Sequence, residues 1–114
     1  MEEQSHSILK IYASTTDKIE NQMLYEFIVY KAHEEGISGV TVFRGIMGFG
    51  SSSKISSTRY WELTEKLPIV IELIDKTELV EKFYKKIKPD LMNMPKGCLV
   101  LMESINVLLQ KSGK

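Results

Sequence analysis

Residues with the chemistry needed to bind an anion gather in the middle of the sequence. They are Arg44, Gly45, Gly48, Gly50, Lys54 and Arg59. Glycine lets the backbone turn sharply and approach a ligand, and backbone N–H groups exposed in this way can contact a phosphate or a carboxylate. Basic side chains nearby would favour the same negative charge. This segment is therefore the best candidate for a functional loop.

Two familiar phosphate-binding motifs do not fit the glycine spacing. Ser51 follows Gly50 where the P-loop motif requires lysine, and serines follow Gly48-Phe49-Gly50 where the dinucleotide-binding motif requires a further glycine. A strand that ends in a bulge or a tight turn would also explain the glycines. The long connection over residues 48–66 favours a functional loop, because such loops are uncommon in compact domains.

Side chains that could act in catalysis or metal binding are scattered. His6 and His33 are the only histidines, and neither has a histidine or cysteine at ligand spacing. The acidic residues that could take part are also scattered: Asp75, Glu78, Asp90 and Glu103. No histidine lies near the serines of residues 51–57, so a serine nucleophile is unsupported. We therefore expect no catalytic site and no metal site.

Composition limits the class of protein. The chain has 114 residues, 43% of them hydrophobic and 26% charged, which is ordinary for one globular domain over residues 1–114. Fifteen basic residues balance fifteen acidic ones, so we expect no nucleic-acid binding. The apolar runs are too short for membrane insertion, and the first residues are not typical of a signal peptide. Cys98 stands alone in an apolar run, so we expect it to be buried in a reduced, cytoplasmic protein.

Apolar patterns predict the strands that must position these residues. Four strands are expected, over residues 7–13, 40–47, 67–74 and 98–102. The third is apolar on both sides, which predicts a central strand covered on both faces. Residues 105–109 are a candidate for a short extra strand, and residues 111–114 are expected to form a flexible tail.

Capping patterns predict two helices. Asp17 and Asp75 resemble helix N-caps, since each is followed by a glutamate three residues later. Apolar residues at helical spacing follow both aspartates. Gly36 is expected to end the first helix and Pro89 the second.

The order of these elements predicts an α+β fold. A βαββαβ order is satisfied by a ferredoxin-like sandwich, in which two helices cover one face of a four-stranded antiparallel sheet. The other face should then be buried in an oligomer. The same fold could bring the turn Pro95-Lys96-Gly97 to the base of the long loop. Two basic, glycine-containing turns that converge in this way would form an anion site.

The motif GISGVTVFRGIMGFG, followed by a polar loop and LPIVIELID, resembles an uncharacterised prokaryotic family of PII-like proteins, domain-of-unknown-function family 190. The resemblance extends from Leu9 to Val107 and is most specific over Thr41–Gly50. It implies a ferredoxin-like homotrimer similar to PII signal-transduction proteins. Those proteins bind adenine nucleotides in clefts between subunits and contact partners through a long loop.

The residue types and the resemblance together suggest roles for individual residues. An adenine nucleotide, or another small anion, would be bound by Arg44, Gly45, Gly48, Phe49, Gly50, Lys96 and Gly97. A protein partner such as a transporter or an enzyme would be contacted by Ser51, Ser52, Ser53, Lys54 and Arg59.

The chain also departs from PII proteins. It lacks their richer Gly/Lys signature before the last strand and the paired arginines in their tail. A non-enzymatic regulator is the leading hypothesis. A small enzyme with an active site at the subunit interface and a metal-responsive trimer are the alternatives.

Overall fold

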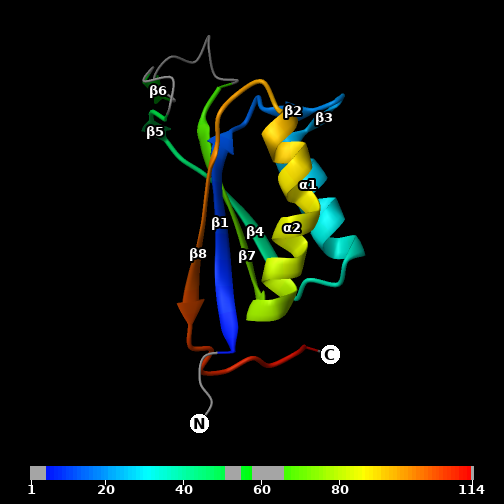
Figure 1. Cartoon of the computed structure of the whole chain (residues 1–114). Helices are drawn as coiled ribbons and strands as arrows, with labels where there is room; N and C mark the ends of the chain where they lie inside the picture. Colours follow the sequence, from blue (N-terminus) through cyan, green and yellow to red (C-terminus); the bar gives the residue numbers. More distant parts are fainter. Residues whose placement is uncertain (1–4, 51–54, 58–65, 114) are drawn as a thin grey trace.

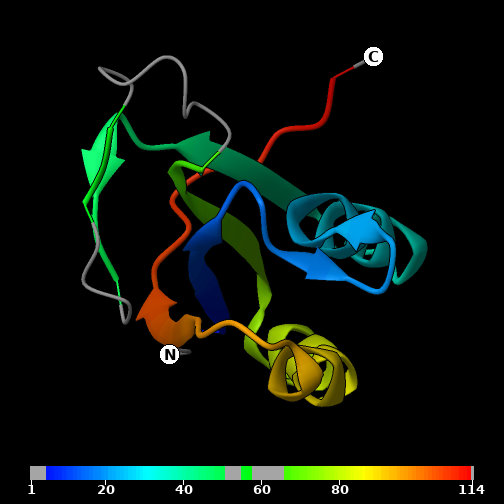
Figure 2. The same cartoon turned by 90° about the horizontal axis from the view of Figure 1, so that it is seen from above.

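The computed structural model describes residues 5–50, 55–57 and 66–113. Its central sheet is antiparallel with the order β4-β7-β1-β8, formed by β1 (His6–Ser14), β4 (Gly39–Arg44), β7 (Pro68–Lys76) and β8 (Leu99–Ile105). Helices α1 (Leu24–Glu34) and α2 (Thr77–Asn93) lie on one side of this sheet (Figures 1 and 2). Two short hairpins join β2 (Lys18–Ile19) to β3 (Gln22–Met23) and β5 (Met47–Gly48) to β6 (Ser56–Ser57). The predicted α+β, ferredoxin-like arrangement is confirmed.

The hydrophobic core lies between the helices and the sheet. Alternate residues of the central strands β1 and β7 are buried, which is the pattern of strands with one covered face. Ile11 and Ile71 from the sheet and Ile28 and Ile87 from the helices are 0% exposed. Burial of such aliphatic side chains is the main stabilising contribution in a domain of this size.

The opposite face of the sheet, here called the open face, is only partly covered. Tyr12, Phe43 and Leu99 remain 39%, 49% and 57% exposed. Val70 and Ile74 of β7 are half-buried. The central position predicted for β7 is confirmed, but within one chain only its helix-facing side is fully buried.

The first helix begins later than predicted. Asp17 is not its N-cap, because the β2–β3 hairpin intervenes and α1 starts at Leu24. Glu20 adopts a φ of 57° in the turn of this hairpin, a conformation incompatible with a first helical turn. The expected end is confirmed: the helix stops before Gly36, which has a φ of 81°.

The second helix also departs from the prediction at both ends. Asp75 is buried in β7, where its carboxylate accepts hydrogen bonds from the backbone N–H groups of Ser38 (2.9 Å) and Lys76 (2.8 Å), and α2 starts at Thr77. Pro89 lies inside α2 instead of ending it. The helix continues because Leu91, beyond the proline, is buried in the core, and this packing offsets the local cost of the proline. In the part of the chain that the structure describes, no helix is long and apolar enough to cross a membrane.

Two strand predictions need correction. The strand predicted over residues 40–47 ends at Arg44. The N–H of Gly45 still donates to the carbonyl oxygen of Pro68 (2.7 Å), but Pro68 has no N–H to return a bond, and the chain then leaves the sheet. The extra strand predicted over residues 105–109 is not formed: Ile105 ends β8, and residues 106–113 have no regular structure.

Candidate ligand-binding cleft

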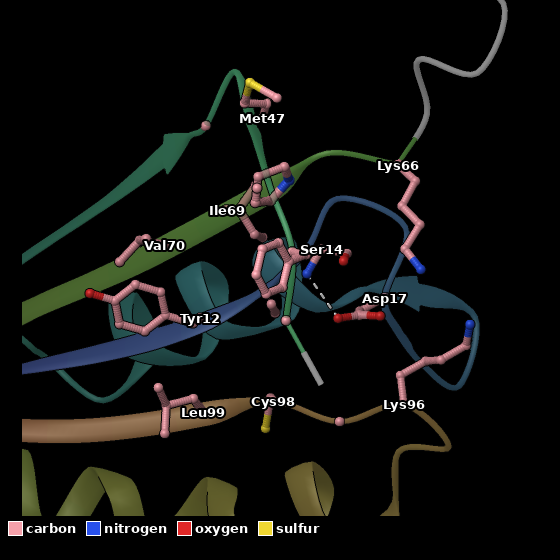
Figure 3. Close-up of a pocket in the computed structure, with 17 residues that line it drawn as sticks. Tyr12, Ser14, Asp17, Met47, Lys66, Ile69, Val70, Lys96, Cys98 and Leu99 are labelled. Carbon is pink, nitrogen blue, oxygen red and sulfur yellow. Dashed lines mark hydrogen bonds between the residues drawn. The ribbon is translucent and has the colours of Figure 1, made fainter. Parts of the chain in front are cut away.

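A cleft of about 620 Å³ lies where the central strands meet the β5 hairpin (Figure 3). Its walls come from the end of β1, from residues 45–50, from the start of β7 and from the turn that leads into β8. These segments are far apart in the sequence. The antiparallel pairing of β1 with both β7 and β8 brings them together.

One wall of the cleft is apolar. Tyr12 of β1 pairs with Val70 of β7 and with Leu99 of β8, so the three side chains lie side by side on the open face. Met47 lines the cleft from the β5 side (Figure 3). A wall built from an aromatic ring and branched aliphatic groups is suited to a flat, apolar part of a ligand.

The other end of the cleft carries charges. Lys66 and Lys96 line it together with Asp17, and the three lie at the same end in Figure 3. Within the residues that the structure describes, neither lysine takes part in an ion pair. Their charges are therefore available to a ligand, whereas Asp17 is 6% exposed and its Oδ2 accepts the N–H of Ser14 at 2.9 Å.

Cys98 lies on the cleft wall next to this charged end. The expectation that it is buried was wrong: Cys98 directly precedes the edge strand β8 and is exposed. Partial burial in the cleft raises the pKa of its thiol, and the negative charge of Asp17 raises it further. The thiol is therefore neutral at neutral pH and adds no charge to the cleft.

Gly45 acts through close packing rather than through its N–H group. A Cβ at this position would lie 3.0 Å from Cγ of Pro68, so only glycine fits without displacement. Its N–H is already bonded to the carbonyl oxygen of Pro68, which leaves it unable to donate to a ligand. At Gly50 a Cβ would meet no atom within 4 Å. The glycines at the loop base therefore have different roles.

The structure gathers most of the predicted ligand-binding residues. Those that line the cleft are Gly45, Gly48, Phe49, Gly50, Lys96 and Gly97, so the two predicted turns do converge. Arg44 does not line it, because strand alternation places it with Val42 on the helix-facing side of β4. The predicted partner-contacting residues, Ser51, Ser52, Ser53, Lys54 and Arg59, lie outside the described residues. Ligand binding by these residues stays a prediction.

Several cleft residues were not anticipated from the sequence. They are Tyr12, Ala13, Ser14, Asp17, Met47, Lys66, Pro68, Ile69, Val70, Cys98 and Leu99. Asp17 was interpreted as a helix cap, and the apolar residues were assigned to strands without a register. Of these residues, Lys66 was the easiest to find from the sequence, because it is a basic residue at the C-terminal end of the predicted long loop.

A metal site can be assessed over the same described ranges, 5–50, 55–57 and 66–113. No group of three or more histidine, cysteine, aspartate or glutamate side chains in them is placed to hold a metal ion.

Solved structures share this architecture. The CPII protein of Thiomonas intermedia K12, determined with ADP, AMP and acetate bound, aligns with a TM-score of 0.62 at 19% identity, covering 90% of this chain and 87% of CPII. A PII-like signalling protein of Thermus thermophilus aligns with a TM-score of 0.63 at 16% identity, covering 88% of this chain and 86% of that protein. At these identities the similarity establishes a common PII-like fold.

Sequence comparison identifies the family. A UPF0166 protein of Aquifex aeolicus is 35% identical over 81 residues, which cover 71% of this chain and 77% of that protein. The DUF190 family, described as Uncharacterized ACR, COG1993, matches residues 6–107. The resemblance noted in the sequence is thus confirmed: the fold is PII-like, and the chain belongs to the DUF190 family.

Proposed function

We propose that this protein is a non-enzymatic, PII-like regulator that binds an adenine nucleotide in the cleft. The observation that carries the proposal is the pairing, within one cleft, of an apolar wall with a basic end. Tyr12, Val70 and Leu99 form the wall, and Lys66 and Lys96 form the basic end.

This division matches the chemistry of a nucleotide. The base is a flat ring that packs on aromatic and aliphatic groups, and the phosphate is an anion that lysine attracts. Phe49 and Gly50 lie at the same cleft and add a further aromatic ring and unobstructed backbone. The structure of CPII with ADP and AMP supports the choice of an adenine nucleotide.

We further propose that three copies of the chain assemble through their open faces. Tyr12, Phe43 and Leu99 would lose their present exposure in such a trimer. Tyr12 and Leu99 also belong to the cleft wall, so a neighbouring subunit would complete the ligand site.

The β5 hairpin would link the ligand to a protein partner. Met47 and Phe49 line the cleft while remaining 54% and 70% exposed. Ile46 and Ile55 beside them are 73% and 64% exposed. A ligand that packs on Met47 and Phe49 would change which apolar groups this hairpin presents, and a partner protein would recognise that difference.

Titration calorimetry with AMP, ADP, ATP and cyclic AMP tests the ligand. Lys96→Ala should weaken binding about tenfold, since a charge-assisted contact to phosphate is lost. Lys88→Ala, which removes an exposed lysine of α2 outside the cleft, is the matched control and should bind as the wild type does. If none of the four nucleotides binds at millimolar concentration, the proposal is wrong.

A further inference from the structure

We infer that Asp17 makes the cleft selective for a phosphorylated ligand that carries hydroxyl donors next to its phosphate, as the ribose of a nucleotide does. This inference rests on the proposed nucleotide function and goes beyond it. An anion site does not otherwise need a buried carboxylate. The inference gives the carboxylate of Asp17 a role in selecting the ligand.

Asp17 is held in one position by the backbone around it. The N–H of Ser14 donates to its Oδ2 at 2.9 Å, and its own carbonyl oxygen accepts the N–H of Leu24 at 2.8 Å. The residue is 6% exposed and forms part of the cleft lining. Its carboxylate is therefore a fixed feature of the cleft that a ligand must accommodate.

An ionised carboxylate only accepts hydrogen bonds, and its two oxygens have about four lone-pair positions. A ligand that closes the cleft removes water from whichever of these positions the protein does not fill. A hydroxyl on the ligand replaces that water, whereas an apolar group leaves the carboxylate unsatisfied and a second anion is repelled. Asp17 thus favours donors and disfavours dense negative charge.

The order of groups in the cleft identifies the donor. Lys66 and Lys96 lie beside Asp17, and the apolar wall containing Tyr12 and Leu99 lies farther along (Figure 3). In a nucleotide the ribose separates the phosphate from the base. With phosphate at the lysines and the base on the wall, the ribose hydroxyls are the groups nearest to Asp17.

The charge of the cleft supports the same selectivity. Among the residues that the structure describes, the charged side chains lining the cleft are two lysines and one aspartate, a balance of one positive charge. A net charge of this size suits a ligand with few phosphate groups better than a polyanion. Replacing Asp17 by asparagine keeps a side-chain oxygen for the N–H of Ser14, removes the negative charge and puts an NH2 donor in place of the second oxygen acceptor.

The test is calorimetry on wild-type protein and Asp17→Asn with AMP, 2′,3′-dideoxy-AMP, inosine monophosphate and inorganic pyrophosphate. The wild type should bind AMP about tenfold more tightly than dideoxy-AMP, because the dideoxy ligand leaves Asp17 unsatisfied. In Asp17→Asn that ratio should fall towards one, and pyrophosphate should bind about tenfold more tightly than it does to the wild type.

The two proposals fail in different ways. If the wild type binds AMP and dideoxy-AMP equally, the selectivity of Asp17 is refuted while nucleotide binding stands. A wild type that discriminates against inosine monophosphate but not against dideoxy-AMP would place the donor on the base and refute the ribose assignment. If no nucleotide binds the wild type, both proposals fall. These ligand comparisons need only the wild-type protein, so they hold even where Asp17→Asn does not fold.

Discussion

The two faces of the central sheet are buried to different degrees. On the helix-facing side, Ile11 and Ile71 are 0% exposed and belong to a core that includes residues of both helices. On the open face, the neighbouring Tyr12 is 39% exposed and Val70 is half-buried. Adjacent residues of the same strands therefore have opposite environments. One face is completed within the chain, whereas the other has the composition of a surface that another molecule covers.

Because of this difference, we assign folding and the proposed function to different faces of the sheet. The buried face contributes the core that holds the strands in register. The open face provides the cleft wall and the surface proposed for assembly, so ligand binding and oligomerisation would both use the face that folding leaves available. Substitutions on the two faces should consequently have effects of different kinds.

The largest effect on stability is expected from the helix-facing side. Ile71→Ala should lower the free energy of unfolding by about 3 kcal/mol, since it removes buried methyl groups and leaves a cavity. Urea denaturation at several protein concentrations measures this loss, which should be the same at each. A loss that disappears on dilution would show that Ile71 is stabilised by assembly, and the distinction between the faces would then fail.

A charge on the open face should affect assembly instead. Phe43→Asp is expected to convert the proposed trimer into monomers, because an isolated carboxylate would be buried at the interface, while the far-ultraviolet circular dichroism stays that of a folded chain. Light scattering coupled to size-exclusion chromatography measures the mass. Tyr30→Asp is the matched control, since Tyr30 is an exposed aromatic residue on α1. Equal masses for wild type and Phe43→Asp would contradict the assembly proposal.

A smaller effect is expected where the loop leaves the sheet. Gly45→Ala should destabilise the protein by about 1 kcal/mol, because the added Cβ would lie 3.0 Å from Cγ of Pro68 and force a local shift. Gly50→Ala, where the Cβ meets nothing within 4 Å, should change stability by less than about 0.5 kcal/mol. Thermal unfolding of the two variants makes the comparison. Equal losses would mean that the contact with Pro68 is not what requires glycine.

The smallest effect concerns the thiol in the cleft. Because its pKa is raised, Cys98 should react with iodoacetamide more slowly at pH 8 than a free cysteine does, and the rate should rise only at higher pH. Asp17→Asn removes the negative charge that contributes to the raised pKa of Cys98, so the midpoint of the rate–pH profile should move to lower pH. A profile that is the same in both proteins would show that the charge of Asp17 does not reach the thiol.

Apolar patterns were enough to predict the main strands and both helices. Residues 67–74 form a short apolar run typical of a central strand, and apolar residues at helical spacing mark both helices. Local polar patterns were less reliable. Asp17 and Asp75 both resemble helix caps. Instead, Asp17 accepts the N–H of Ser14 in the turn after β1, and Asp75 accepts the N–H of Ser38, which lies 37 positions away. A contact over that separation cannot be detected in a short window of sequence.

The cleft was predictable only in part. Topology alone suggested that Lys96-Gly97 would meet the glycines at the loop base, and it does. The apolar wall depends on the register that sets Tyr12 opposite both Val70 and Leu99. A shift of one residue would turn each of these side chains to the other face, and nothing local in the sequence distinguishes the two registers.

The hydrogen bond between the N–H of Gly45 and the carbonyl oxygen of Pro68 joins the two ends of the intervening segment at the edge of the sheet. With its ends joined, a change in the length of that segment costs little more than the entropy of closing a longer loop, about 0.6 kcal/mol for each doubling. Evolution could therefore replace this segment without redesigning β4 or β7.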